Sequence, residues 1–393
     1  MKKLKFISLP LLALILAYVV FAVFIHKPVI KPAYKSLSFS TSPNLAWPPG
    51  SEAAVGIVGT NILNVNGVQT PKPTASTAKL ITALMVLKAK PLSLNEQGPT
   101  LTMTQSDVDI YNKYVAENGS VAQVAANEQI SEYQMLQGML LPSANNMADS
   151  LAIWAYGSLP AYSSAANSFL AGLGLKDTHV GTDASGFDPS TVSTAADLVK
   201  IGELVMQDPV LSSIVNQPTA NIPVAGVIRN VNNLLGQDNI VGVKTGNTDQ
   251  AGGVFVGAAK LDINNTPTTV VTANVGTKTL GLALTTSLPL LRSAQANFHN
   301  TILANQGTVV ATYTTPWNKQ SVSAITSQPI TATVWGGTVI NLPEPRLASI
   351  KSNARVNEIV GKLSDSSIGS TVANVSLAKD LSKPSIWWLL THP

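Results

Sequence analysis

The chain has 393 residues, enough for two or three domains, and 45% of them are hydrophobic, as in ordered globular proteins. Only 12% are charged, and the net charge of +4 is spread thinly without a basic run interleaved with aromatic residues, so a nucleic-acid partner is not expected. The absence of cysteine excludes disulfides, zinc-thiolate sites and a cysteine nucleophile.

The N-terminus has the pattern of a membrane anchor. Residues 1–5 contain three lysines, and residues 6–25 form an uncharged apolar run. At 1.5 Å per residue this run can span a hydrocarbon core of about 30 Å. A cleavable signal peptide has a shorter apolar region and a small-x-small site, whereas His26 and Lys27 follow directly here. We therefore predict an uncleaved transmembrane helix in preference to a cleaved signal, with residues 1–5 cytoplasmic and everything after the helix outside the cell membrane.

Helices and strands are mixed in the next part of the chain. Residues 26–43, rich in Pro, Ser and Lys, are predicted to be a linker. Residues 44–302 then form one domain, in which a strand in "AAVGIVGTN" precedes a helix that begins near Ser76. "SEYQMLQGMLLPSANNMADSLAIWAYG" predicts two helices joined at Leu141-Pro142-Ser143, and "STAADLVKIGELVMQDP" predicts another.

Three apolar runs rich in β-formers follow. "NIVGVKTG", "AGGVFVGAAKL" and "TTVVTANVG" are separated by short polar turns, which indicates an antiparallel meander. Residues 280–303 are predicted to form a helix, broken near Pro289.

The last part of the chain changes character. Short Thr/Val-rich segments predict a small all-β domain over 303–380. The tail, 381–393, carries Trp387 and Trp388 beside leucines. It either rests at a membrane interface or packs on the β domain. The fold class is therefore α+β: an antiparallel sheet flanked by helices, then the β domain, with an N-terminal transmembrane helix.

Histidine is too scarce to suggest the usual catalytic sets. A Ser-His-Asp triad would need His179 or His299, and no HExxH or other closely spaced set of metal ligands includes His179. No metal or cofactor is therefore expected. Ser76 and Lys79, three residues apart at a helix start, share one helix face, so a lysine amine can meet a serine hydroxyl. Ser76 is either a helix cap or a nucleophile with Lys79 as its base, and a lysine base must be neutral.

Three short motifs occur in a fixed order. SxxK is found at Ser76–Lys79 and again at Ser376–Lys379, where it lies in a predicted strand. SxN occurs three times, but only Ser143-Ala-Asn145 lies at a helix junction of the core. KTG occurs once, at Lys244-Thr245-Gly246, at a strand end.

Together, "TASTAK", "LLPSANN" and "GVKTGNT" resemble the penicillin-binding, β-lactamase-type serine acyltransferases. The wider stretches "MLLPSANNMADSLA", "DASGFDPSTVSTAADLVKIG" and "NLLGQDNIVGVKTGNTDQAGGVFVGAA" are similar to the low-molecular-mass serine-type D-alanyl-D-alanine carboxypeptidases. The resemblance extends from about Asn44 to Leu303, with a β domain following as in many members.

The resemblance implies a mechanism. Ser76 attacks the carbonyl between the last two D-alanines of a peptidoglycan stem peptide, and Lys79, kept neutral by Lys244, takes its proton. Ser143 passes a proton to the leaving D-alanine, and Asn145 holds the substrate amide and Lys79. Thr245 and Lys244 bind the terminal carboxylate, beside Gly246. The N–H groups of Ser76 and Asn247 form the oxyanion hole, and β-lactam antibiotics acylate Ser76 as inhibitors.

Two positions depart from the family pattern. Asn247 stands where members commonly carry His after KTG, and no arginine follows the next strand, where only Lys278 is charged. Carboxylate recognition is therefore the least defined part of the predicted site.

Other activities use the same motifs. A D,D-endopeptidase would share them all, and a class A β-lactamase would need a glutamate after SxN. Glu203 is the only glutamate between Asn145 and Lys244, and no ExxLN surrounds it. A cell-wall-binding scaffold without turnover would not need all five residues of the motifs. Ser143 as a cap of the next helix and Asn145 as a structural residue remain the simpler alternatives.

Overall fold

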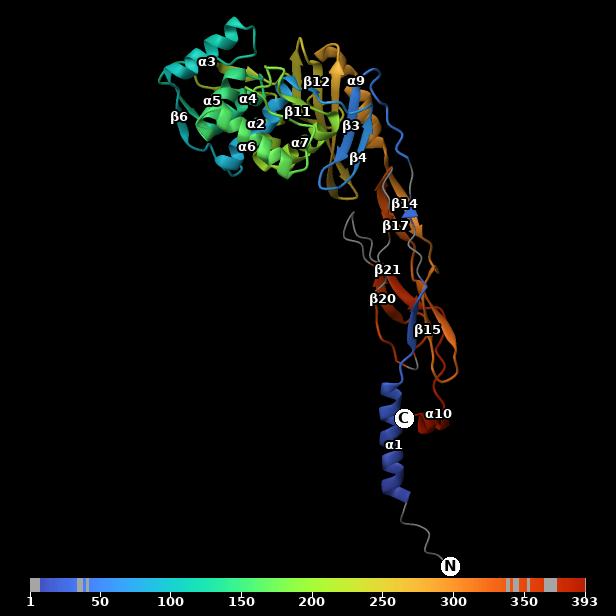
Figure 1. Ribbon diagram of the computed structural model, residues 1–393. Coiled ribbons are helices and arrows are strands. Elements are labelled where there is room, and N and C mark those ends of the chain that lie inside the picture. The colour runs from blue at the N-terminus through green and yellow to red at the C-terminus, as the bar shows by residue number, and fades with distance from the viewer. Residues whose placement is uncertain are drawn as a thin grey trace, which may run out of the picture. The chain divides into compact units, whose positions relative to one another are not determined.

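The computed structural model of the protein describes residues 8–33, 38–39, 42–336, 340–341, 346–351, 354–363 and 373–392. The chain forms two compact units, one of Asn44–Asn297 and one that combines Met1–Pro43 with Phe298–Pro393 (Figure 1). The division at Asn297 lies before the boundary at 302 that the sequence suggested. The reason is strand β14, Phe298–Ala304, which pairs with β17, Ile330–Trp335.

The larger unit is built on a five-stranded antiparallel sheet in the order β11-β12-β13-β3-β4. This confirms the predicted meander of three consecutive strands and the α+β class. The strands are β3 Glu52–Ile57, β4 Leu63–Asn66, β11 Ile240–Thr248, β12 Gly252–Ile263 and β13 Thr266–Thr277.

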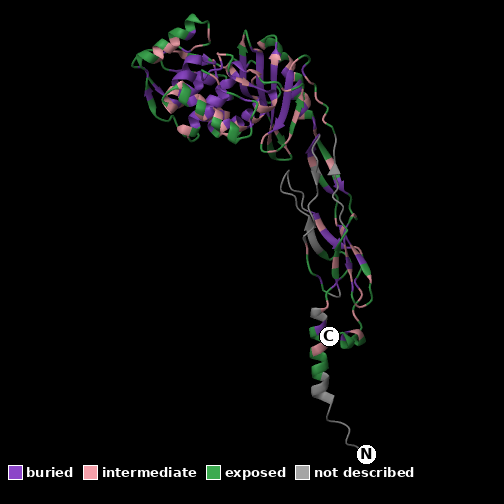
Figure 2. Cartoon of the chain, viewed as in Figure 1, coloured by how far each residue is buried: buried purple, intermediate pink, exposed green. Residues whose placement is uncertain are grey.

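Helices cover both faces of this sheet. α7, Ala195–Gln207, packs on β13 and β3, and α9, Leu280–Ala296, packs on β12 and β13. Gly202 of α7 lies against Val256, whereas Leu291 of α9 lies against Gly257. Because neighbouring residues of a strand point to opposite faces, the two helices lie on opposite sides. Burial on both faces explains why these strands are continuous apolar runs (Figure 2).

The helical part of this unit surrounds α2, Lys79–Ala89, which packs against α4, α5 and α7. The predicted pair of helices around Leu141-Pro142-Ser143 is confirmed as α4 and α5. The remaining elements are α3 Gln105–Ala116, α4 Glu132–Leu140, α5 Asn145–Tyr156, α6 Leu159–Gly172, α8 Pro209–Val215, β5 Lys72–Pro73, β6 Thr100–Thr102, β7 Gln129–Ser131, β8 Val192–Ser193, β9 Thr219–Ile222 and β10 Gly226–Arg229.

The helix predicted over 280–303 is shorter than expected and is not broken. α9 runs through Pro289 and ends at Ala296. Ser287, Leu290 and Leu291 around the proline are buried, so packing on the sheet outweighs the hydrogen bond that proline cannot donate. The rest of the stretch becomes β14, because its backbone pairs with β17.

The smaller unit contains a six-stranded sheet in the order β1-β15-β16-β21-β20-β19, together with the pairs β14-β17 and β18-β2. The predicted linker is in part a strand, because Val29–Pro32 (β1) pairs with β15 in antiparallel register. The other strands are β2 Ser38–Phe39, β15 Val309–Thr314, β16 Ser321–Thr326, β18 Ile340–Asn341, β19 Arg346–Leu347, β20 Ile359–Leu363 and β21 Ala373–Leu377.

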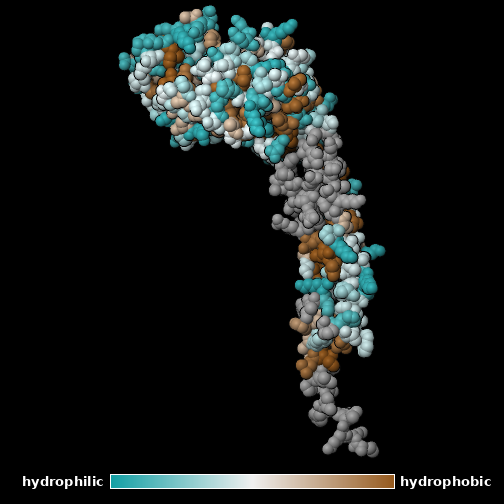
Figure 3. Space-filling model, viewed as in Figure 1, coloured by the Kyte–Doolittle hydropathy of each residue, from teal (hydrophilic) through white to brown (hydrophobic). Residues whose placement is uncertain are grey.

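Two helices mark the chain ends in this unit, α1 Ser8–Ile25 and α10 Ile386–Thr391, which contact each other. The Trp388 ring packs edge-on against His26 and Trp317, while Trp387 is 76% exposed. Figure 3 shows apolar surface around these two helices. Among the residues that the structure describes, none of the helices combines the length and the apolarity that a membrane crossing requires.

Candidate active site

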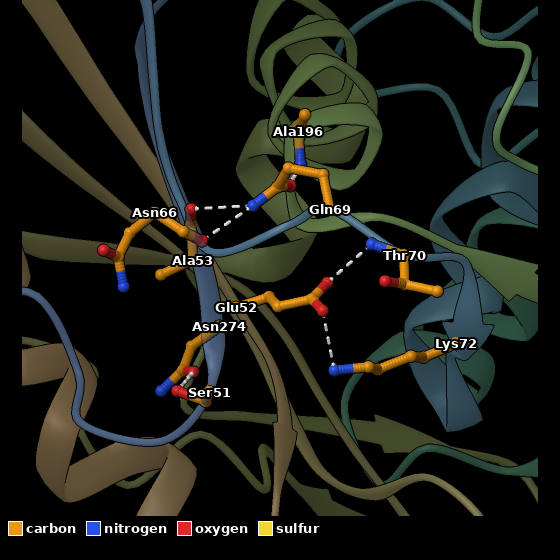
Figure 4. A network of polar contacts seen from close by, with 9 residues as sticks. All are labelled: Ser51, Glu52, Ala53, Asn66, Gln69, Thr70, Lys72, Ala196 and Asn274. Atoms are coloured by element: carbon orange, nitrogen blue, oxygen red, sulfur yellow. Dashed lines mark hydrogen bonds and ion pairs between the residues drawn. The ribbon is translucent and has the colours of Figure 1, made fainter.

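The segment that leads to Ser76 is fixed to the start of β3 by a polar network (Figure 4). Lys72 Nζ lies 2.9 Å from Glu52 Oε1, and Glu52 Oε2 accepts a hydrogen bond from the Thr70 N–H at 2.8 Å. Gln69 donates to the Ala53 carbonyl of β3 at 3.3 Å. The chain therefore enters the site from an anchored position.

Ser76 lies in a 3₁₀ turn, Ala75–Ala78, directly before α2. Ala75 has a φ of +45°, a left-handed conformation that costs a non-glycine residue about 1 kcal/mol or more. The surroundings enforce it, because Gly186 and Gly246 pack so closely that a Cβ on Gly246 would lie 2.9 Å from the Thr74 carbonyl. Two glycines and one strained residue thus set the position of the serine.

The Ser76 hydroxyl is hydrogen-bonded to Lys79 and does not act as a helix cap. Lys79 Nζ lies 2.8 Å from Ser76 Oγ, 2.7 Å from Asn145 Oδ1 and 3.1 Å from the Ser185 carbonyl oxygen. The last two partners are oxygens that only accept. They take up two N–H bonds of the amine, so a neutral amine would turn its lone pair toward the Ser76 hydroxyl. This is the geometry of a general base and its nucleophile.

The electrostatics favour that neutral form. Lys79 is fully buried, and burial lowers its pKa to about 7. The carboxylates of Asp183 and Asp149 act in the opposite direction and raise it. The sequence analysis requires a neutral lysine base, and desolvation is the main cause that favours the neutral form here. Burial, and then repulsion from the Lys79 ammonium group, hold the pKa of Lys244 well below its usual value.

Lys244 reaches the site from β11 and holds the second serine. Its Nζ donates to Ser143 Oγ at 2.9 Å and to the Thr245 carbonyl at 3.0 Å. Ser143 has a φ of +69°, and the cap position of α5 is Ala144, without a side-chain bond. The hydroxyl of Ser143 is therefore used by the lysine and does not cap the helix.

Strand β11 continues past Lys244 to residues at the protein surface. Thr245 and Gly246 are buried, whereas Asn247 is exposed and pairs with Gly253. Asn247 lines a cavity of about 540 Å³ together with Lys278, and a second of about 680 Å³ together with Lys113 and Phe187. The structure thus gathers the predicted residues Ser76, Lys79, Ser143, Asn145 and Lys244 and extends the site along the end of β11.

The sequence missed two buried carboxylates and one carbonyl that shape the site. Asp183 accepts the N–H groups of Ser185, Gly186 and Asp188 at 3.0, 2.7 and 2.7 Å, which folds the loop that offers the Ser185 carbonyl to Lys79. Asp149 supports the same loop. One signal was available for Asp149, because it lies four residues after Asn145 on the same face of α5.

The alternative residues take other places. His179 pairs through its backbone with Val192, and His299 belongs to β14 in the other unit. Glu203 lies in α7 and bonds to Lys200 at 3.0 Å. The second SxxK begins at Ser376 in β21, as the sequence suggested. In the described ranges, His, Asp and Glu side chains form no set of three that could hold a metal ion.

Comparison with known proteins identifies relatives of this arrangement. The profile of the peptidase S11 family, D-alanyl-D-alanine carboxypeptidase, matches residues 50–277. The D-alanyl-D-alanine endopeptidase of Escherichia coli (strain K12) is 31% identical over 276 residues, which cover 67% of this chain and 81% of that relative.

Solved structures agree with the fold. The crystal structure of the Streptomyces K15 DD-transpeptidase has a TM-score of 0.56 at 24% identity, covering 65% of this chain and 99% of that one. Penicillin binding protein 5 from Haemophilus influenzae has a TM-score of 0.60 at 21% identity, covering 87% of this chain and 99% of that one. The family match spans more than half of the sequence, and this chain therefore belongs to the peptidase S11 family of serine DD-peptidases.

Proposed function

We propose that the protein is a D,D-carboxypeptidase that removes the terminal D-alanine from peptidoglycan stem peptides through an acyl-enzyme on Ser76. One observation supports this most directly: a buried lysine, with a pKa of about 7, sits 2.8 Å from the serine hydroxyl with its other contacts made to acceptors only. A base of that pKa is suited to reaction near neutral pH.

The acylation step then uses the groups around Ser76. Ser76 Oγ bonds to the carbonyl carbon of the D-Ala-D-Ala bond as Lys79 takes the hydroxyl proton. The backbone N–H groups of Ser76 and Asn247 stabilise the oxyanion. The C–N bond breaks when the leaving nitrogen receives a proton through Ser143, which Lys244 holds at 2.9 Å. D-alanine departs as a free amine and the acyl group remains on Ser76.

Water completes the cycle by attacking the ester, which restores the Ser76 hydroxyl and releases the shortened peptide. A β-lactam places a strained amide where the D-Ala-D-Ala bond would lie. Ring opening then transfers its acyl group to Ser76, so β-lactams act as inhibitors. No metal or cofactor takes part in the proposed steps.

The choice between terminal and internal bonds is tested with two substrates. Purified full-length protein is incubated with a stem peptide ending in D-Ala-D-Ala and, separately, with a cross-linked peptide dimer, and the products are identified by mass spectrometry. We expect free D-alanine from the first and little cleavage of the second. Faster cleavage of the dimer would support endopeptidase activity, in line with the name of the E. coli relative. Binding of penicillin without product from either peptide would support a scaffold, and rapid hydrolysis of penicillin a β-lactamase.

Recognition of a terminal carboxylate needs a cation near the end of β11, and we propose that Lys278 supplies it beside Thr245 and Lys244. Lys278 is exposed and lines the same cavity as Asn247. We expect Lys278→Ala to lower kcat/KM for D-alanine release about 10- to 100-fold, because a charge-assisted hydrogen bond contributes about 1.5–3 kcal/mol.

A peptide with an amidated C-terminus should be processed equally by the wild type and by Lys278→Ala, because it carries no carboxylate. The control is Lys260→Ala, which removes an exposed lysine from β12 outside this cavity. The assignment would be contradicted if Lys278→Ala lowered kcat/KM equally for the free and the amidated peptide. It would also be contradicted if Lys260→Ala lowered kcat/KM as much as Lys278→Ala does.

The close approach of Gly246 to the 3₁₀ turn gives a further prediction. A Cβ at this position would lie 2.9 Å from the Thr74 carbonyl and 3.2 Å from the Ser76 nitrogen. We expect Gly246→Ala to slow acylation by a fluorescent penicillin about a hundredfold, because small displacements of a nucleophile have effects of that size. Gly172→Ala, where a Cβ meets nothing within 4 Å, should react at the wild-type rate. A wild-type rate for Gly246→Ala would mean that the turn adjusts without cost.

We also propose that residues 6–25 hold the protein in the cell membrane with the larger unit outside the cytoplasm. The apolar run of the sequence supports this, as do the exposed side chains of Leu14, Leu16, Val20 and Phe21 on α1. Exposed Trp387 on the neighbouring α10 would suit the interface. Alkaline extraction of membranes from expressing cells should leave the full chain in the pellet and release a variant without residues 2–25. Release of both would contradict the anchor.

A further inference from the structure

Asp149 is a buried carboxylate that none of the proposed chemical steps uses. It lies on α5, one turn after Asn145, with 2% of its surface exposed. Its Oδ2 accepts a hydrogen bond from the Tyr114 hydroxyl at 2.7 Å, and its Oδ1 accepts one from the Ala184 N–H at 2.9 Å. Both carboxylate oxygens are therefore committed, one to α3 and one to the loop that follows Asp183.

That loop connects Asp149 to the base. Ala184 precedes Ser185, whose carbonyl accepts the hydrogen bond from Lys79 Nζ at 3.1 Å. The Ala184 carbonyl in turn accepts a hydrogen bond from Thr82 Oγ1 of α2 at 2.5 Å. The N–H of Ala184 is thus held by Asp149 and its carbonyl by α2. Asp149 fixes one end of the peptide that positions a partner of Lys79.

Charge provides a second connection. The groups that face Asp149 are Tyr114 and Lys113 from α3, Asp183 from the loop and Lys79 from α2. Burial raises the pKa of Asp149 to about 6, so the carboxylate is ionised at neutral pH, and its negative charge raises the pKa of Lys79. When Lys79 takes the proton of Ser76 it becomes a buried ammonium ion. A nearby negative charge in a buried site lowers the energy of that ion.

We propose that Asp149 is a positioning residue for Lys79, which fixes the loop carrying the Ser185 carbonyl and supplies the negative charge that tunes the base. The inference depends on the proposed function, because it assigns Lys79 the role of base.

Asp183 raises the pKa of Lys79 more than Asp149 does, but Asp149 is the better residue to substitute. Asp183 accepts three backbone N–H groups, so its loss would unfold the loop. In Asp149→Asn the amide oxygen can still accept from Ala184, and the amide nitrogen can donate to the Tyr114 hydroxyl, which also accepts. The substitution therefore removes the charge while it retains the contacts.

The experiment measures the second-order rate of acylation of the full chain in detergent by a fluorescent penicillin between pH 5 and pH 9. We expect the rise of the rate with pH to move to lower pH in Asp149→Asn, by about one pH unit or less, since the lost charge lowers the pKa of Lys79. The plateau rate should fall roughly threefold, because a weaker base accepts the proton less readily. Tyr114→Phe removes a hydrogen bond that lowers the pKa of Asp149, so a smaller fraction of Asp149 is ionised near neutral pH. The pKa of Lys79 then falls, and the rise of the rate should move to lower pH by a smaller amount than in Asp149→Asn.

Tyr162→Phe is the matched control. The Tyr162 hydroxyl bonds to Thr82 at 2.8 Å and so supports the same loop without touching Asp149. Its pH dependence should equal that of the wild type. A merely structural role for Asp149 would slow the variants without moving the rise, and that result would overturn the inference.

Two further results are decisive. If Asp149→Asn does not fold, equal pH dependences for Tyr114→Phe and Tyr162→Phe overturn the inference, and different ones support it. If even the wild type is not acylated, the proposed function fails by itself. The pKa of Lys79 is then read from ¹³C NMR of labelled lysine side chains in the same variants, where the same order of shifts is expected.

Discussion

Ser76→Ala should abolish covalent labelling by penicillin. Intact mass spectrometry of the wild-type chain after brief incubation with benzylpenicillin is expected to show one added penicillin, and the variant none. The reason is chemical, because the Ser76 hydroxyl lies 2.8 Å from the buried amine of Lys79 and is placed by a turn that two glycines confine. D-alanine release should fall by about a thousandfold or more, since only binding and oxyanion stabilisation would remain.

Ser93→Ala is a suitable control for this experiment. Ser93 begins another SxN sequence, but it is exposed and is not one of the residues around Ser76. This variant should therefore be labelled like the wild type. A penicillin adduct on Ser76→Ala would contradict the proposed mechanism, because the penicillin would then have reacted with another nucleophile.

The elements that the sequence predicted well are those whose stability depends on local pattern. The strands of the meander are apolar runs that remain apolar on both faces of the sheet, and they ended where Asn, Asp and Gly allow turns. The junction at Pro142 was visible because proline cannot continue a helix. The motif residues Ser76, Lys79 and Lys244 could be found for a similar reason, since the chemistry needs those residue types in those local settings.

The errors occurred where distant pairing decides the structure. In residues 298–303, Phe298, Ile302 and Leu303 have a spacing that suits a helix, but pairing with β17 makes the segment a strand. Val29–Pro32 has the composition of a linker, and only its register with β15 makes it an edge strand, where proline is tolerated.

Parts of the site were hidden for the same reason. Asp149 and Asp183 look like ordinary surface residues in the sequence, and their influence on Lys79 depends on burial that no local pattern reveals. The φ of Ala75 likewise results from the packing of Gly186 and Gly246 around it.

The second large effect is expected at Lys79. The rate of acylation by penicillin should rise with pH through about 7, because the pKa of Lys79 is lowered to that value by burial and only the neutral amine can accept the Ser76 proton. Lys79→Met removes the amine and should lower the acylation rate by about 10²- to 10⁴-fold, the range for loss of a general base. The remaining reaction should lose the rise near pH 7. The measurement is the acylation rate of a fluorescent penicillin across pH 5–9.

Two comparisons separate the base from a structural lysine. Lys88→Met replaces an exposed lysine in the last turn of the same helix and should keep both the rate and the rise near pH 7. Lys79→Arg keeps a positive charge that does not titrate in this range, so it should be as slow as Lys79→Met if the amine acts as a base. If the charge alone mattered, Lys79→Arg would retain most of the activity, and the neutral lysine would then have no role in activating Ser76.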